Sequence, residues 1–97
     1  MKVILVDAIH TLIIPEKGIY DPLFNILETY PNRKIVLTGA NDKEFSQHGL
    51  DKIPYEVFTL KHNPEKSNPN YYKILLEKFN MIVEDLIYIE HNLEAVH

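Results

Sequence analysis

Short apolar runs alternate with amphipathic segments along the chain, and this alternation limits the possible folds more than any other feature. Four of the runs are too short to be helices and are rich in β-branched or aromatic residues, as expected for strands buried on both faces. They cover residues 2–7, 34–38, 55–60 and 86–89. Because strands that alternate with helices form parallel sheets, the sequence predicts a three-layer α/β fold with a parallel sheet of about four strands.

Three segments between these runs carry helix start signals. Each begins at an Asp or Asn, and in two of them a proline follows directly, which is favoured in the first helical turn. In the second segment Glu44 follows Asn41 by three residues, which is the spacing of a capping box. In the third segment apolar side chains recur at helical spacing. We therefore expect helices over residues 21–30, 41–48 and 68–79.

The length allows one small domain, which we assign to residues 1–97. A chain of 97 residues buries roughly 60–70% of the surface that its unfolded form exposes. Apolar residues make up 45% of the sequence and charged residues 25%, as is usual for globular domains. The net charge of −4 and the scattered lysines oppose binding to nucleic acid or to an anionic membrane. We therefore expect no nucleic-acid partner.

The chain has no cysteine, which excludes disulfides, thiolate metal sites and a cysteine nucleophile. Its first apolar stretch, Val3 to Ile14, is interrupted by Asp7 and His10 and is too short and too polar to span a bilayer. No small-residue cleavage pattern follows that stretch. We therefore expect a cytoplasmic domain without a membrane partner.

Polar residues gather where the predicted strands end, and ligands of parallel α/β sheets bind at the carboxyl ends of the strands. Each residue has an ordinary structural reading by itself, because an aspartate or glutamate can cap a turn and a single lysine is usually solvated. Taken together they point to an anion site near a carboxylate. The residues are Asp7, Thr38, Gly39, Lys66, Glu90 and His91.

In chain order these positions resemble the four motifs of the haloacid dehalogenase (HAD) superfamily of aspartate-nucleophile hydrolases. The matching segments are Val3-Ile-Leu-Val-Asp7-Ala-Ile-His-Thr11-Leu12, Ile35-Val-Leu-Thr38-Gly39, Lys66-Ser-Asn-Pro69-Asn-Tyr71-Tyr72 and Leu86-Ile-Tyr-Ile-Glu90-His91-Asn-Leu-Glu-Ala95-Val. The resemblance covers nearly the whole chain and implies a Rossmann-like sheet without a cap domain. The first strand is then central, with the second and third on one side and the fourth on the other. The family's final helix and strand are missing from this chain.

The resemblance also implies roles for these residues. Asp7 would attack the phosphorus of a phosphorylated substrate and form an aspartyl-phosphate, which water then hydrolyses. Thr38, Gly39 and Lys66 would hold the phosphoryl oxygens. Mg²⁺ would bind to Asp7, to the backbone carbonyl of Ile9 and to the acidic position of the fourth motif, where this chain has Glu90 and His91.

Three positions depart from the family pattern. Ile9 replaces the aspartate that acts as general acid and base, and losing such a group typically lowers a rate by about 10²–10⁴. His91 replaces the main magnesium aspartate, and imidazole suits Mn²⁺ or Zn²⁺ better than Mg²⁺. Ala95 replaces a further Asp or Asn. We therefore predict a weakly active or inactive HAD-like domain that acts by binding or assembly with a protein partner. The alternative is an active capless phosphatase.

Two other readings are weaker. The stretch Asp7-Ala-Ile-His-Thr11-Leu12 is also similar to the first motif of the true haloacid dehalogenases, which need no metal, but this chain has no room for the cap that encloses their substrates. A phosphoacceptor receiver domain would need an acidic pair after the first strand, and Ala8 follows Asp7. The five histidines raise the possibility of a metal site that includes His10 and His91, but separate loop histidines are the simpler reading of residues 10, 48, 62, 91 and 97.

The run over residues 86–89 is predicted to be an edge strand without proline or lysine, the kind of edge that pairs with another chain. Since the family's last helix and strand would cover this edge, we expect either a homodimer with the fourth strand at or near the contact or a chain that is part of a longer protein.

Overall fold

Four parallel strands form the central sheet of the computed structural model, which describes residues 2–89. The strands are β1 (Val3–Asp7), β4 (Lys34–Leu37), β5 (Glu56–Phe58) and β6 (Leu86–Ile89), and their order in the sheet is β5-β4-β1-β6. The prediction of a four-stranded parallel α/β sheet with a central first strand is therefore confirmed. β6 has the predicted bounds, whereas the other three strands are shorter than predicted.

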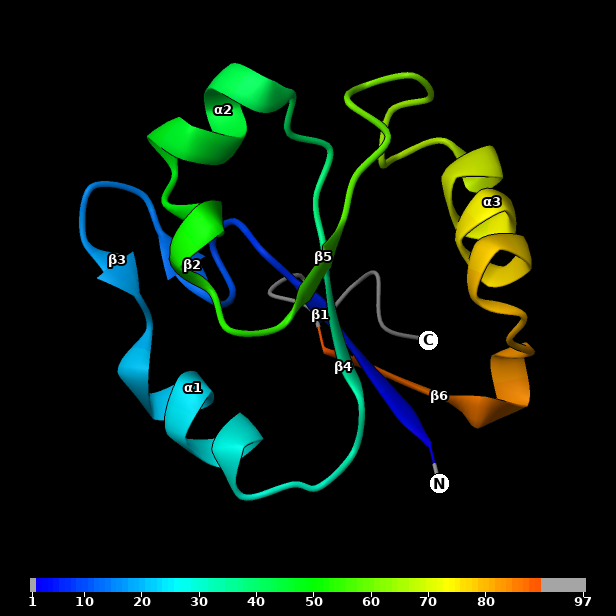
Figure 1. Cartoon of the computed structure of the whole chain (residues 1–97), viewed down its shortest axis with the longest axis horizontal. Helices are drawn as coiled ribbons and strands as arrows, with labels where there is room; N and C mark the ends of the chain where they lie inside the picture. The colour runs from blue at the N-terminus through cyan, green and yellow to red at the C-terminus, as the bar shows by residue number, and fades with distance from the viewer. Residues whose placement is uncertain (1, 90–97) are drawn as a thin grey trace.

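Helices cover both faces of the sheet (Figure 1). On one side lie α1 (Asp21–Glu28), α2 (Asp42–Gln47) and the short 3₁₀ helix η1 (Leu50–Lys52), and on the other lies α3 (Pro69–Phe79). A second 3₁₀ helix, η2 (Val83–Asp85), leads into β6. No helix within residues 2–89 is both long and apolar enough to cross a membrane.

Alternation along the buried strands divides the core into two layers. Ile4 and Val6 of β1 pack with Leu27 of α1 and Leu50 of η1 in one layer. The second layer contains side chains from the opposite face of β1 and β4 together with residues of β5 and α3, namely Leu5, Ile35, Leu37, Phe58, Tyr71 and Leu75. Burial on both faces explains why the strands read as continuous apolar runs.

The helix ends follow the predicted capping signals with one exception. Asn41 and Glu44 form the complete capping box of α2, and Asn68 caps α3 by accepting a hydrogen bond from the Asn70 amide at 2.9 Å. Asp21, expected as the N-cap that precedes Pro22, is instead the first residue of α1, and Tyr20 occupies the N-cap position. Asp21 instead lies in the first turn, where an acidic side chain is favoured by the helix dipole.

A short antiparallel hairpin follows β1 and was not predicted. Its strands are β2 (Ile13–Ile14) and β3 (Gly18–Ile19), and Glu16 and Gly18 in its turn have φ angles of 71° and 94°. Strands of two residues are too short to show the alternating pattern by which strands are recognised in a sequence. The hairpin lies beside α2 and η1 on the α1 side of the sheet (Figure 1).

The hydroxyl of Tyr71 joins α3 to the carboxyl ends of two strands. It lies 2.7 Å from the Thr38 carbonyl and 3.0 Å from the Phe58 carbonyl, and it accepts a hydrogen bond from the Thr38 amide at 3.1 Å. Tyr71 is fully buried, and this burial raises the pKa of its hydroxyl, so the group stays a neutral donor. This contact fixes the start of α3 against the edge where the predicted site lies.

We predict that Tyr71→Phe destabilises the domain by about 1–2 kcal/mol, because backbone groups at the end of β4 and β5 lose a buried partner. Urea denaturation followed by circular dichroism measures this change. Tyr30→Phe is the matched control, since Tyr30 is 49% exposed. An unchanged midpoint for Tyr71→Phe would show that the hydroxyl does not stabilise this junction.

Candidate active site

Asp7 and Lys66, 59 residues apart in the sequence, form an ion pair at the carboxyl end of β1. The Asp7 side chain is 8% exposed and the Lys66 side chain 22%. Thr11 donates a second hydrogen bond to the other carboxylate oxygen of Asp7, at 3.3 Å. The structure thus brings together the two residues that the sequence analysis named as catalytic candidates.

A tight turn after β1 places Thr11 over Asp7. The Ala8 carbonyl accepts hydrogen bonds from the amides of Thr11, Leu12 and Ile13 at 3.3, 2.9 and 2.8 Å. The side chain of Ile9 packs against the core layer on the α1 side of the sheet. Ile9 is only partly buried, so it places an apolar side chain where the resemblance implies an acid–base aspartate.

Thr38 and Gly39 lie beside Asp7, since Leu37 is the register partner of Asp7 in the sheet. Thr38 is buried, and its hydroxyl accepts a hydrogen bond from the Ala40 amide at 3.2 Å. The Thr38 amide is held by the Phe58 carbonyl at 3.1 Å as well as by Tyr71. Within residues 2–89 the Gly39 amide donates to no backbone carbonyl. It is therefore a backbone donor that is available to a ligand.

Lys66 and His62 approach Gly39 closely. A Cβ atom at position 39 would lie 3.5 Å from Nδ1 of His62 and 3.7 Å from Cβ of Lys66. A pocket of about 270 Å³ opens beside this contact. Its lining residues come from the loops after β1, β4 and β5 and from α2 with its C-cap, and they are Ile9, Thr38, Gly39, Ala40, Glu44, His48 and His62.

His62 bridges two glutamates at the rim of this pocket, and this cluster was not predicted. Its Nε2 lies 2.5 Å from Glu44 and its Nδ1 lies 2.9 Å from Glu65. Hydrogen bonds to Glu65 and Glu44 raise the pKa of His62, whereas the Asn41 amide and then His62 lower the pKa of Glu44. Only the three-residue spacing of His62 and Glu65 was visible in the sequence. The contact with Glu44 depends on the folded chain.

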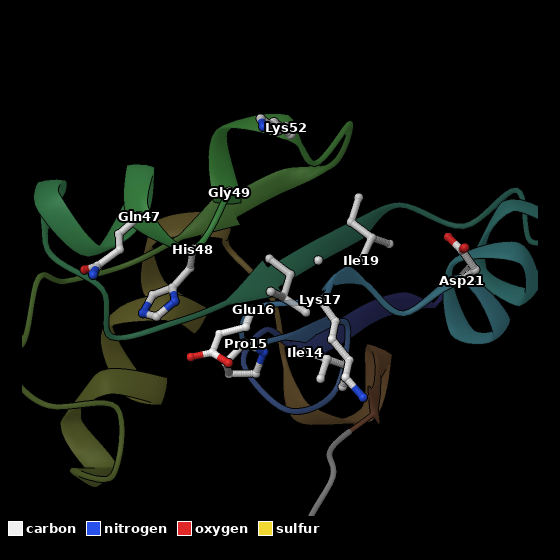
Figure 2. A pocket seen from close by; sticks show the side chains of 12 residues that line it. Ile14, Pro15, Glu16, Lys17, Ile19, Asp21, Gln47, His48, Gly49 and Lys52 are labelled. Atoms are coloured by element: carbon white, nitrogen blue, oxygen red, sulfur yellow. The ribbon is translucent and has the colours of Figure 1, made fainter.

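A second pocket, of about 490 Å³, lies between the β2–β3 hairpin and the segment from α2 to η1. Figure 2 shows His48 extending from the end of α2 toward the side of the hairpin where Pro15 and Glu16 lie. His48 also lines the smaller pocket beside Gly39. The two pockets therefore meet at His48, next to the predicted site.

Of the residues expected to bind a metal ion, Asp7 and Ile9 lie among the described residues. Glu90 and His91 lie outside the described residues. Within residues 2–89 no group of three or more histidine or acidic side chains is placed to hold a metal ion. His10 lines a different depression, with Thr11 and residues at the start of α1. Asp7 is thus the one expected side-chain ligand that the described site supplies.

This arrangement pairs a carboxylate with an ammonium group and a backbone amide at the open edge of a parallel sheet. A lysine in this position can neutralise either the carboxylate or an anion bound next to it. Comparisons with protein-family models, curated proteins and solved structures found no match to this chain. The function therefore has to be inferred from the geometry of the site.

We predict that Asp7 and Lys66 are energetically coupled by about 1–3 kcal/mol, because the Asp7 carboxylate is buried and loses its cation when Lys66 is replaced. A double-mutant cycle with Asp7→Asn and Lys66→Met, followed by urea denaturation, measures the coupling. The same cycle on Arg33 and Glu56, whose side chains are each 48% exposed, is the control and should give a smaller value. Equal coupling in the two cycles would contradict a special role for the Asp7–Lys66 pair.

Proposed function

We propose that this chain is a HAD-like domain that binds a phosphoryl group at Asp7 and Lys66 and has at most weak hydrolytic activity. The observation that carries the proposal is the Asp7–Lys66 ion pair at the end of the central strand. Support also comes from Thr38 and Gly39 on the neighbouring strand end and from the strand order β5-β4-β1-β6. The resemblance implied each of these features.

The proposed chemistry uses groups of this site and water. A carboxylate oxygen of Asp7 attacks phosphorus, and the bond from phosphorus to the ester oxygen breaks, so that the leaving group departs as an alkoxide and takes a proton from water. Water then attacks the aspartyl-phosphate, which releases inorganic phosphate and restores the carboxylate. Lys66 and the Gly39 amide offset the charge on the phosphoryl oxygens during both steps.

Two features of the site keep this chemistry slow. Ile9 has no side-chain proton to give to the leaving group and cannot take one from water. The carboxylates of Glu44 and Glu65 lie at the rim, where they repel a phosphate dianion. The site is therefore better suited to holding a phosphoryl group than to turning it over.

The proposed ligand is large or macromolecular. Within residues 2–89 only the hairpin separates β1 from α1, and only α2 and η1 separate β4 from β5. Neither insertion is a domain that would enclose a small substrate, so the partner itself would have to exclude water. A phosphorylated protein or other large phosphate ester fits this open edge.

The proposal also includes a divalent cation. Asp7 and the Ile9 carbonyl would hold Mg²⁺, and Glu90 or His91 would complete the set, with Mn²⁺ or Zn²⁺ as alternatives because of His91. Since Asp7 is the only one of these side chains among the described residues, we derive no step through a metal ion.

Beryllium fluoride, which mimics a phosphoryl group on an aspartate, tests the binding proposal. We expect ¹⁹F NMR to detect a bound species in the wild type with Mg²⁺, Mn²⁺ or Zn²⁺, each tried separately. Asp7→Asn should abolish it and Lys66→Met should weaken it strongly. Asp85→Asn is the control, because Asp85 is exposed and lies in η2, before β6 begins and away from the carboxyl ends of the strands. The absence of a bound species with every metal would overturn the proposed function.

We predict that wild-type turnover of an aryl phosphate is weak and that Ile9→Asp together with His91→Asp raises it by about tenfold or more, because a general acid–base group and a metal ligand are restored. Steady-state release of the aryl alcohol measures the rate. Ile9→Asn with His91→Asp is the matched control, since it disturbs the core equally but cannot transfer a proton. A fast wild-type rate that these changes do not improve would refute the argument from Ile9.

We also propose assembly through β6, which the exposed apolar side chains around it favour. Ile82, Val83 and Ile87 are 59%, 67% and 42% exposed. Within the described residues β6 pairs with β1 alone and is the last strand on that side of the sheet. A second copy of the chain would bury these side chains and this edge across a two-fold axis.

We predict that the wild type is a dimer at micromolar concentration and that Ile87→Lys makes it a monomer, because a charge would be buried in the contact. Light scattering coupled to gel filtration measures the mass. Ile26→Lys is the control, since Ile26 is 53% exposed on α1, far from β6 along the sheet. A monomeric wild type would refute the assembly through β6.

A further inference from the structure

The loop between β5 and α3 is tied to α2 by two consecutive residues with unusual backbone conformations. Lys61 and His62 have φ angles of 53° and 65°, a left-handed conformation that residues with side chains seldom adopt. Lys61 forms an ion pair with Asp42 at 3.0 Å, and His62 contacts Glu44 at 2.5 Å. Conformations of this kind persist where the surroundings hold them, and here both side chains reach the same helix.

The two contacts of His62 require a doubly protonated ring. Glu44 and Glu65 are both acceptors, and a neutral imidazole has only one N–H to donate. Glu44 is itself held in place, because the Asn41 amide donates to the same oxygen at 3.0 Å in the capping box. The ring therefore bridges α2 and the loop as an imidazolium, and one bridge is lost when a proton leaves.

Other ionisable groups surround this bridge. His48 lines the same pocket from the end of α2, and Asp42 of α2 faces Lys61. Glu65 and Lys66 are on the loop itself. The hydrogen bonds to Glu65 and Glu44 raise the pKa of His62, so the imidazolium persists above the ordinary value of about 6.5.

The bridge also restrains the backbone of Lys66, because Lys66 directly follows Glu65. On its other side a turn closed by the Asn68 amide and the Glu65 carbonyl, at 2.9 Å, connects Lys66 to the cap of α3. The ring of His62 and the stem of Lys66 both lie against Gly39. The backbone of Lys66 is thus held between the capped end of α3 and the Glu65–His62–Glu44 bridge.

We propose that His62 is a positioning residue, which as an imidazolium between Glu44 and Glu65 holds Lys66 in place for the phosphoryl site at Asp7. This inference rests on the proposed function and adds a pH dependence to it. The bridge is complete while His62 is protonated, and it opens as the pH rises through the raised pKa of the ring. Affinity for a phosphoryl-like anion should therefore fall over the same range.

Sulfate binding tests the proposal, because sulfate is a tetrahedral dianion that does not itself titrate over the pH range involved. Isothermal titration calorimetry should show two- to tenfold tighter binding to the wild type at about pH 6 than at about pH 8.5, a modest ratio because the ion pairs are half-exposed. His62→Gln should bind at all pH values as the wild type does at high pH. His62→Arg, which keeps a charge that does not titrate, should also remove the pH dependence.

His48→Gln is the matched control, because His48 is a histidine of the same pocket without a place in the bridge, and it should keep the wild-type profile. A pH dependence that persists in His62→Gln, or that disappears in His48→Gln, would overturn the inference while leaving the proposed function intact. Sulfate and beryllium fluoride that both fail to bind to the wild type at any pH would overturn the proposed function and this inference with it. Amide NMR spectra of each variant verify that it is folded.

Discussion

A carboxylate at the end of a strand that is buried on both faces must be compensated, and this requirement organises the structure around Asp7. β1 is central and paired on both sides, so its last residue cannot turn away from the sheet edge without breaking the ladder. Leaving such a charge without a partner costs several kcal/mol. Thr11 and Lys66 provide the compensation. Because Lys66 comes from the loop before α3, the compensation also determines how that helix approaches the sheet.

The sheet and the contact between Asp7 and Lys66 could be predicted because both depend on patterns that can be recognised in the sequence alone. Continuous apolar runs mark buried parallel strands, and the carboxyl ends of such strands meet at one edge. The β2–β3 hairpin was missed because two-residue strands leave no periodicity. The bridge from His62 to Glu44 was missed because its partners lie 18 residues apart, in a loop and in a helix whose spacing carries no signal. In the sequence Glu44 looked like a capping residue only. In the structure it caps α2 and also contacts His62.

The charges around the site would favour selective binding of a phosphoryl ligand rather than high affinity for it. Lys66 and a protonated His62 are paired with carboxylates at this site, Lys66 with Asp7 and His62 with Glu44 and Glu65. A phosphoryl dianion would therefore enter a region whose positive charges are already neutralised. It would have to take over Lys66 from Asp7 at least in part, and the half-exposed glutamates would add repulsion that solvent weakens. Such a site gains more from additional contacts with a large ligand than from its charge.

The Asp7–Lys66 ion pair also affects how reactive the Asp7 carboxylate would be as a nucleophile. A carboxylate that is tightly paired with an ammonium group is a poor nucleophile, because its charge is already stabilised in the resting site. In the proposed chemistry Asp7 would become reactive when Lys66 shifts its interaction to the phosphoryl oxygens, because the stabilisation would then be larger in the transition state than in the resting site. A loop that holds the backbone of Lys66 firmly while its side chain is free to exchange partners satisfies both needs. The ties on either side of Lys66, one to the α3 cap and one through His62 to α2, restrain the backbone and leave the ammonium group free to move.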